Sequence, residues 1–403
     1  MTLLNFCTYL IFYFEILFLN YIEYKTYKSI INPFSFLSIP FSLVVSICLL
    51  FNKKIDFVLL YAPSIWIWIF GMSLFWLAGR LCHIFYKNTR PGPQFAGNIE
   101  KNKVPLLFLL FCFCITCLKL NSIDTSLIGS KELGAEVSIG GLMGRVSNLM
   151  LLFFPYVFLH NFKPIIKILI IGVLLFFLIS MGSKTWMMCA LLASIICMVQ
   201  KNKLRISLYT GILVVLVLGF AFFLYYALTS GNEDVMELIS FVARHFYFYL
   251  TSGTLAMSEY VRWAPSIDVG HFRLPFITIV MIWLGVVKQG SGHSPLWFAT
   301  DMIHGTESNV FTMFGQIYVG TGFWGFIFYC MFFGCWCYWI YIKSRKYTNI
   351  YISIINSYNL SLLFFAWFNC GFSILRTWEI SVYAFIFYVV SKYKLSFRIS
   401  YEK

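Results

Sequence analysis

The sequence contains little charge. Only 11% of its 403 residues are charged and 60% are hydrophobic, whereas a soluble globular protein is usually about 25% charged and about 45–50% apolar. This balance excludes an ordinary soluble protein. Apolar runs such as Leu106–Leu118 and Leu169–Ile179 recur along the chain, and each approaches the roughly 20 apolar residues that a helix needs to cross a bilayer. We therefore expect an all-α polytopic integral membrane protein.

Familiar catalytic and metal-binding motifs are also missing. The sequence has no HExxH zinc motif, no Walker phosphate loop and no GxSxG nucleophile motif. Histidines and acids between 293 and 307 are spaced unlike any familiar zinc site, so we interpret them as solvated loop residues. The net charge of +14 favours anionic lipid headgroups and does not require a nucleic-acid partner. We expect no metal and no cofactor.

Apolar segments predict about 11 transmembrane helices, with 13 as the upper bound. The first segment lacks a basic region before it and a small-residue cleavage site after it, so we expect a retained span and not a signal peptide. The predicted spans are 3–22, 34–51, 57–79, 104–120, 142–160, 165–181, 185–200, 207–228, 323–342, 352–370 and 378–391.

Basic residues orient these spans. They cluster in five places that fall on one side of the membrane if the spans alternate, and the positive-inside rule makes that side cytoplasmic. The pair Lys53–Lys54 would lie outside, which leaves the topology of the N-terminus open. The five clusters are Arg80 to Lys103, Lys163 with Lys167, Lys201 to Arg205, Lys343 to Lys346, and Lys392 to Arg398.

The same layout divides the chain into three parts. We expect about eight transmembrane helices in 1–228, a large external region in 229–322, and the last helices with a cytoplasmic tail in 323–403. A structureless connection as long as 229–322 is uncommon unless it is functional. Because this region contains apolar, helix-compatible stretches, we predict a membrane-apposed cap of amphipathic or re-entrant helices.

One segment of the cap, Arg244–Arg262, is apolar yet carries charges at both ends. On a helical wheel its polar residues fall within one arc of roughly 140°, which predicts a helix that lies at the membrane interface or lines a cavity. An ordinary anchor helix would show the same pattern. The adjacent donors Arg244 and His245, followed by Glu259, favour an anionic substrate and an acceptor that must lose a proton.

Three further basic residues lie near the ends of predicted spans. Arg145 begins the span 142–160, Lys184 lies in a tight external turn, and Arg273 opens the second apolar piece of the cap. Charges near the membrane core are costly and often functional. The alternative for Lys184 is that its side chain simply reaches the interface.

Three stretches, in this order, resemble the O-antigen polymerase (Wzy) family. Ile179–Arg205 joins two spans through a Gly-Ser-basic turn, Arg244–Val261 is an aromatic-rich helix in the large external region, and Asn309–Tyr329 leads through a tyrosine and a Gly-rich turn into a span. With the span layout, the resemblance covers most of the chain from about Asn121 onward. One departure is that Tyr318–Gly322 lacks the acidic residue that many members carry there.

The resemblance implies a GT-C-like glycosyltransferase of the bacterial inner membrane with its active site facing the periplasm. It would polymerise undecaprenyl-pyrophosphate-linked oligosaccharide repeat units for lipopolysaccharide without a metal ion. The growing glycan would leave its lipid pyrophosphate and pass to a hydroxyl at the non-reducing end of a new unit. Inner-membrane lipids, a chain-length regulator and a flippase of the same pathway are the other expected partners.

This chemistry assigns roles to the basic and aromatic residues. Arginine can stabilise a departing pyrophosphate without a metal, and the acceptor hydroxyl needs a base, for which His245 and Glu259 both stay open. We predict Arg244, His245 and Glu259 as catalytic, Arg145, Lys184 and Arg273 as pyrophosphate-binding, and Tyr249, Asn309 and Tyr318 as sugar-binding.

Two other functions compete with polymerisation. A ligase that transfers finished glycan to a lipid-A core would use the same donor, and the sequence separates it poorly from a polymerase. A transporter or flippase of lipid-linked sugars would also place charges in spans, but such proteins are typically built from repeated halves with discontinuous helices at matching positions. No internal repeat is evident, and the external region is asymmetric, so we prefer the polymerase.

Overall fold

The fold is that of a computed structural model. It describes residues 3–87, 114–115, 141–160, 162–180, 184–201, 235–263, 272–286, 298–300, 307–308, 310–346 and 349–392, with a few single positions between 204 and 223. In these residues the chain forms 11 α-helices, short 3-10 turns and one pair of two-residue strands. The predicted all-α class is therefore confirmed for the described part of the chain.

Most of the described α-helices overlap the predicted apolar segments, although several of their ends differ. Strands β1 (Phe298–Ala299) and β2 (Glu307–Ser308) pair antiparallel, and the 3-10 turns are η1 (Asn52–Lys54), η2 (Ala62–Ser64) and η5 (Gly371–Ser373). The α-helices are α1 (Leu3–Tyr27), α2 (Pro33–Phe51), α3 (Ile65–Lys87), α6 (Gly141–Leu159), α7 (Pro164–Ser180), α8 (Lys184–Gln200), α10 (Val235–Trp263), α11 (Pro275–Trp283), α12 (Met313–Lys346), α13 (Ile350–Phe364) and α14 (Leu375–Lys392).

Four of the described helical segments are long and apolar enough to cross a membrane. They are Leu3–Tyr27, Pro33–Lys54, Ala62–Tyr86 and Met313–Lys346. Shorter apolar helices occur at 148–159, 164–175, 185–200 and 350–364. These lengths and compositions indicate a multi-pass membrane protein. The predicted spans 104–120 and 207–228 lie mostly outside the described residues.

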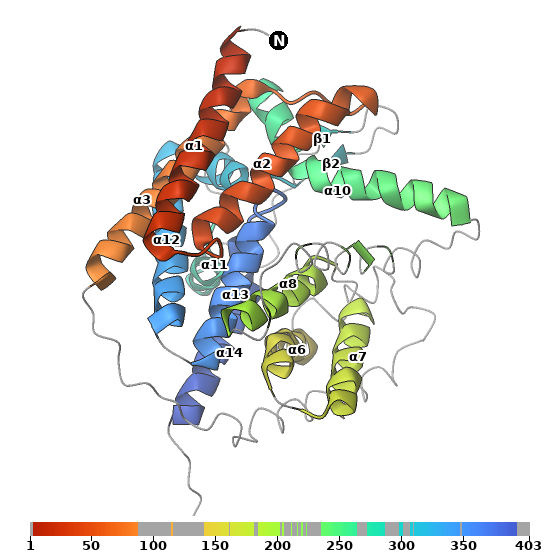
Figure 1. The fold of residues 1–403 in the computed structure, drawn as a ribbon, viewed down its shortest axis with the longest axis vertical. Coiled ribbons are helices and arrows are strands. Elements are labelled where there is room, and N and C mark those ends of the chain that lie inside the picture. The colour runs from red at the N-terminus through yellow and green to blue at the C-terminus, as the bar shows by residue number, and fades with distance from the viewer. Residues whose placement is uncertain are drawn as a thin grey trace, which may run out of the picture. The chain divides into compact units, whose positions relative to one another are not determined.

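The chain forms two compact units (Figure 1), each assembled from segments that are distant in the sequence. The first unit comprises Met1–Thr89, Ser230–Ile342 and Asn359–Thr377, and the second comprises Arg90–Thr229, Lys343–Tyr358 and Trp378–Lys403.

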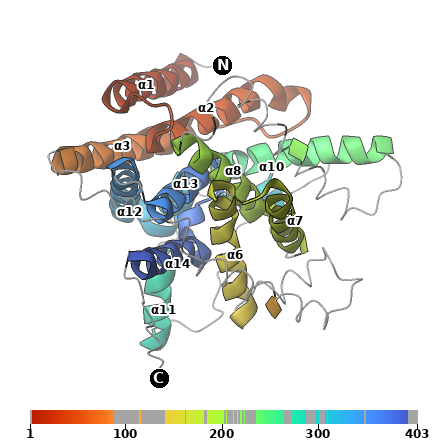
Figure 2. The same cartoon turned by 60° about the horizontal axis from the view of Figure 1, so that its bottom comes forward.

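In the first unit, α3 packs between α1 and α12 (Figure 2). Glycines on α3 allow this close packing, because a Cβ atom at Gly79 would lie 2.3 Å from the Tyr338 ring. At the far end of α3, the buried Trp68 stacks on Phe41 and donates its indole N–H to Thr312 at 3.0 Å. These contacts join α2, α3 and α12 into one apolar core.

In the second unit, α6 packs against α8 and α7. The buried hydroxyl of Tyr358 donates a hydrogen bond to the Leu151 carbonyl at 2.5 Å, and the rings of Tyr156 and Tyr351 stack at 6.4 Å. These contacts attach the first part of α13 to α6.

The predicted span 57–79 is wrong at both ends. Its helix begins only at Ile65, because the preceding residues are extended and the N–H of Val58 bonds to the Thr300 carbonyl at 3.1 Å. The helix continues to Lys87, so Arg80 lies inside α3 and not in a loop. Hydropathy could not separate the extended apolar segment from the helix that follows it.

Two C-terminal boundaries also differ from the prediction. The predicted span 352–370 ends as a helix at Phe364. Residues 365–370 form turns whose backbone is bonded locally and, through Cys370, to Gln316 at 3.1 Å. The predicted span 323–342 is part of the longer α12, which is broken at Gly322 with φ 67° and ψ −172°. This left-handed conformation strongly favours glycine.

Candidate functional site

The central element of the candidate site is α10. It has 29 residues, so it is about 44 Å long. Its N-terminal half extends beyond the other helices of the first unit (Figure 1), and apolar side chains there are exposed, such as Met236 at 74%. In contrast, every residue from 251 to 260 is buried. Of the two placements predicted for this helix, the membrane interface is therefore wrong for the second half, whose polar side chains contact protein.

Small residues explain how the second half of α10 becomes buried. Gly253 lies directly on the backbone turn at residues 367–368, where a Cβ atom would come within 2.5 Å of the Phe368 carbonyl oxygen. Thr254 donates to the Trp367 carbonyl at 3.5 Å, and Thr251 bonds back to the Tyr247 carbonyl at 2.9 Å. The Thr-Ser-Gly-Thr sequence that interrupts the apolar pattern is thus a packing surface.

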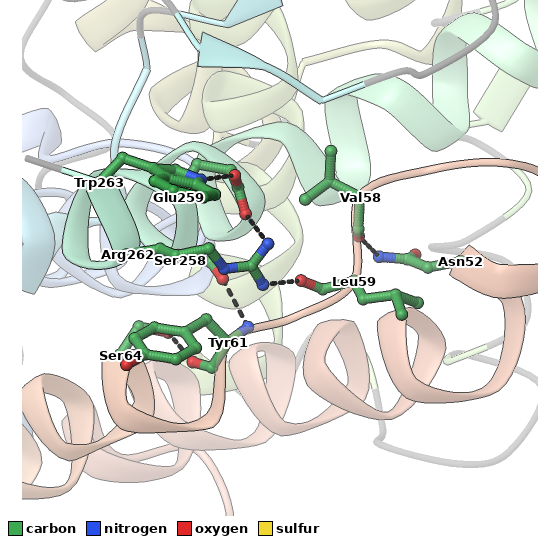
Figure 3. Close-up of polar contacts among 9 residues, drawn as sticks. All are labelled: Asn52, Val58, Leu59, Tyr61, Ser64, Ser258, Glu259, Arg262 and Trp263. Atoms are coloured by element: carbon green, nitrogen blue, oxygen red, sulfur yellow. Dashed lines mark hydrogen bonds and ion pairs between the residues drawn. The ribbon is translucent and has the colours of Figure 1, made fainter. Parts of the chain in front are cut away.

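Residues 57–64, which we call the clasp loop, hold the C-terminal end of α10 (Figure 3). The N–H of Tyr61 donates to the Ser258 hydroxyl at 2.6 Å, and Arg262 donates to the Leu59 carbonyl at 2.9 Å. Glu259 pairs with Arg262 at 2.8 Å. Its other oxygen accepts a hydrogen bond from the Trp263 indole at 2.8 Å. Both oxygens of Glu259 are therefore engaged, and the carboxylate orients Arg262 toward the clasp loop.

Arg244, His245 and Tyr249 follow one another closely on α10, before its buried second half, and all three are half-buried. The Arg244 guanidinium lies 5.3 Å from the centre of the Phe57 ring, a favourable cation–π distance. The His245 ring lies tilted against the Tyr249 ring at 5.2 Å between ring centres, and the Tyr249 ring lies 5.7 Å from that of Phe368. This basic and aromatic surface is suited to sugar rings and to anionic groups.

The two candidate bases lie far apart. Glu259 follows His245 by 14 residues on one continuous helix, so they are separated by about 21 Å along its axis. The two side chains cannot serve the same reacting atom. The candidate site therefore has an outer end at His245 and an inner end at Glu259.

Arg273 and Tyr318 belong to the inner end. The N–H of Phe272 donates to the Gly320 carbonyl at 3.2 Å, next to the break of α12 at Gly322. Arg273 follows Phe272, is half-buried, and interacts electrostatically with the Tyr329 hydroxyl. Tyr318 packs against a buried cluster that contains Met257 and Tyr260 of α10. The segment before α11 and the broken helix thus meet beside the C-terminal end of α10.

The arginines near the candidate site differ in whether a carboxylate pairs with them. Arg262 is paired with Glu259, and in the second unit Arg145 is paired with Glu379, which also accepts a hydrogen bond from Asn148. Among the described residues, no ion pair joins Arg273 to a carboxylate. The charge of Arg145 is therefore compensated within the protein, and Arg273 lacks such a carboxylate partner in the part of the chain that the structure describes.

Two of the predicted site residues, Lys184 and Asn309, are not fully covered by the described residues. Lys184 is the first residue of α8, but its side chain is outside the described residues, and Asn309 is outside them altogether. In the described part of the chain, no three His, Cys, Asp or Glu side chains gather where they could hold a metal ion.

Sequence reasoning missed Asn52, Tyr247 and Glu379. Asn52 is fully buried and donates to the Val58 carbonyl at 2.6 Å. Burial raises the pKa of Tyr247, so its phenol stays protonated and donates to the Asn52 side chain. An acid in an apolar helix, as at Glu379, was a visible signal. The hydrogen bond between Tyr247 and Asn52 joins residues 195 positions apart, and no sequence pattern indicates it.

Comparison with known sequences assigns the chain to a family of unknown function. No curated protein and no solved structure matches the chain. The sequence profile described as "Family of unknown function (DUF6337)" matches residues 56–397. Because this match covers most of the chain, from the clasp loop to the end of α14, the protein belongs to the DUF6337 family.

Proposed function

We propose that this protein is a membrane glycosyltransferase that polymerises undecaprenyl-pyrophosphate-linked oligosaccharide repeat units at the periplasmic face of the bacterial inner membrane. The multi-pass architecture, the three stretches that resemble O-antigen polymerases and the basic, aromatic surface of α10 all support this function. The observation that carries it is Arg273, a half-buried arginine without a carboxylate partner among the described residues, held beside the break in α12.

Arg273 is suited to bind the pyrophosphate of the donor. Its guanidinium can bind phosphate oxygens with two parallel hydrogen bonds, and a partly buried site strengthens such charge-assisted bonds. As the bond between the sugar and the pyrophosphate breaks, the electron pair leaves with the undecaprenyl pyrophosphate, and Arg273 stabilises this charge. Tyr318 lies two residues before the carbonyl that holds the Arg273 segment and can contact the adjacent sugar.

Glu259 is the candidate base nearer to Arg273, because its neighbour Tyr260 packs in the same cluster as Tyr318. The acceptor hydroxyl attacks the donor sugar carbon and gives its proton to this carboxylate. The ion pair with Arg262 must open before the carboxylate can accept a proton. The outer group of Arg244, His245 and Tyr249, about 21 Å away, then binds a distant part of the long oligosaccharide.

Gel analysis of lipopolysaccharide from a gene-deletion strain tests this function. The deletion, and the deletion complemented with Arg273→Ala, should both lose the ladder and keep the core with one repeat. The matched control is Arg345→Ala at the exposed end of α12, which should restore a normal ladder. A normal ladder with Arg273→Ala, in protein inserted at wild-type level, would remove the proposed role of Arg273.

The same gel separates the competing functions. A ligase would lose all O-antigen from the core when deleted, including the single repeat. A flippase would also lose the single repeat, and lipid-linked units would accumulate on the cytoplasmic side. Retention of the core with one repeat is the pattern that only the polymerase predicts.

A further inference from the structure

Two acidic residues, Glu15 and Glu23, lie within the apolar helix α1. They are eight positions apart, which is about 12 Å along the helix. α1 is one of the helices long and apolar enough to cross a membrane. Carboxyl groups in such a helix are costly and mark functional sites by default. The proposed glycosyl transfer makes no use of either residue.

Glu23 is fully buried and is surrounded by side chains from three helices. Trp76 and Arg80 of α3, Tyr338 of α12 and Tyr27 of α1 itself face its carboxyl group. Among the described residues, neither oxygen of Glu23 makes a well-formed hydrogen bond, and the same holds for the Trp76 indole N–H and the Tyr338 hydroxyl. Three helices thus direct polar groups, whose hydrogen bonds to one another are poorly formed, at one enclosed point.

Arg80 does not neutralise this carboxyl group directly. Its guanidinium donates a hydrogen bond to Thr26 at 2.7 Å and lies 5.7 Å from the Trp76 ring. No ion pair between Arg80 and Glu23 occurs among the described residues. The charge of an ionised Glu23 would therefore be only partly compensated in an interior that excludes water.

Glu15, nearer the N-terminus of α1, also directs its carboxyl group at α3. One of its oxygens accepts a hydrogen bond from the Ser73 hydroxyl at 2.5 Å, and the other is buried without a partner among the described residues. Ser73, Trp76 and Arg80 lie on one face of α3, at helical spacing. The contacts of Glu15 with Ser73 and of Thr26 with Arg80 show that α1 and α3 run parallel here. The polar groups therefore form a track along this helix pair.

We propose that Glu15 and Glu23 form an intramembrane proton-binding site between α1, α3 and α12. A bound proton removes the buried charge and turns the carboxyl group into a donor that can bond to the Tyr338 oxygen, or to a water molecule bridging to Trp76. A metal cation fits less well, because the Arg80 guanidinium and the Trp76 N–H face the same point. The site binds its proton independently of the proposed glycosyl transfer.

Dicyclohexylcarbodiimide tests this proposal, since this apolar reagent modifies protonated carboxyl groups in membranes. The full-length protein, in vesicles of neutral phospholipid, is treated over a range of pH, and the modified peptides are identified by mass spectrometry. We expect adducts on the α1 peptide that decrease as the pH rises. Glu23→Gln should lose one adduct and keep the other at Glu15, and Glu15→Gln should do the reverse.

Infrared spectroscopy provides a second measurement on the same samples. Wild-type protein should show a protonated carboxyl band that is reduced in Glu23→Gln and shifted in Tyr338→Phe. Absence of both the adducts and the band at every pH would overturn the proposal. Protection from the reagent by sodium ions at constant pH would also overturn it, because the site would then bind a metal cation.

Discussion

At the scale of single residues, four arginines of similar appearance in the sequence occupy four different environments. Arg262 and Arg145 are paired with carboxylates, Arg244 lies against a Phe57 ring, and Arg273 lies beside the α12 break without a carboxylate partner in the described residues. The sequence could predict that charges near membrane segments matter. It could not predict the pairing of Arg145, because the partner Glu379 lies in α14, far away along the chain.

The pair of Glu259 and Arg262 gives a prediction at this scale. Glu259→Gln should cost about 1–3 kcal/mol of stability, because a partly buried arginine loses its charged partner. The measurement is the midpoint of thermal unfolding in detergent for Glu259→Gln, Arg262→Gln and the double variant. The costs of the two single variants should not add, since they remove the same interaction.

Polymerisation by the same variants tells whether Glu259 acts as the base. If it does, activity falls far more in Glu259→Gln than in Arg262→Gln, although both lose the same ion pair. Equal losses in the two variants would show that Glu259 only orients Arg262, and His245→Gln would then become the decisive variant.

At the scale of helices and loops, hydropathy predicted where most described helices lie but not how they end. The segments 57–61 and 365–370 are apolar, yet they form an extended stretch and turns. Tertiary contacts supply backbone hydrogen bonds to the first segment, and local turns together with Gln316 supply them to the second. The amphipathic pattern of α10 was read correctly as a helix. Its polar arc was expected at the membrane interface or along a cavity, whereas Gly253 and Thr254 pack on a turn more than 110 residues away.

The close packing of α10 on that turn can be tested with one pair of alanine substitutions. Gly253→Ala should destabilise the protein by about 1–3 kcal/mol, since the new methyl group would overlap a backbone carbonyl. The matched control is Gly172→Ala in α7, where a Cβ atom meets nothing within 4 Å. That substitution should be neutral or stabilise the helix by up to about 1 kcal/mol.

Thermal unfolding in detergent compares the two variants. Equal midpoints for Gly253→Ala and the wild-type protein would contradict the close approach of α10 to residues 367–368.

At the scale of the whole molecule, composition was enough to predict an all-α, multi-pass membrane protein. The candidate site was predictable only in part. The sequence singled out Arg273, Tyr318 and Glu259, but their grouping at one end of α10, away from Arg244, follows from tertiary packing. The acids of α1 received no role from the sequence, where Glu15 falls within the predicted span 3–22 and Glu23 just after it, because nothing in the sequence indicates that α3 and α12 face them.

The proposed topology can be tested with reporter fusions. Alkaline phosphatase inserted after Trp263 should be active, because we place α10 in the periplasmic region. Green fluorescent protein fused after Lys346 should fluoresce, because basic residues at this end of α12 favour the cytoplasm. The opposite pattern would place Arg273 on the cytoplasmic side and exclude the proposed reaction.

The central claim is that this chain joins lipid-linked repeat units and that Arg273 binds the departing pyrophosphate. The most direct measurement is polymerisation of defined undecaprenyl-pyrophosphate-linked repeat units by the purified full-length protein in vesicles. We predict products of many repeats from the wild-type protein and from Arg345→Ala, and a loss of at least about 100-fold in Arg273→Ala. If folded wild-type protein produces nothing longer than a single repeat, the proposed function is wrong. If Arg273→Ala polymerises at the wild-type rate, the proposed site is wrong.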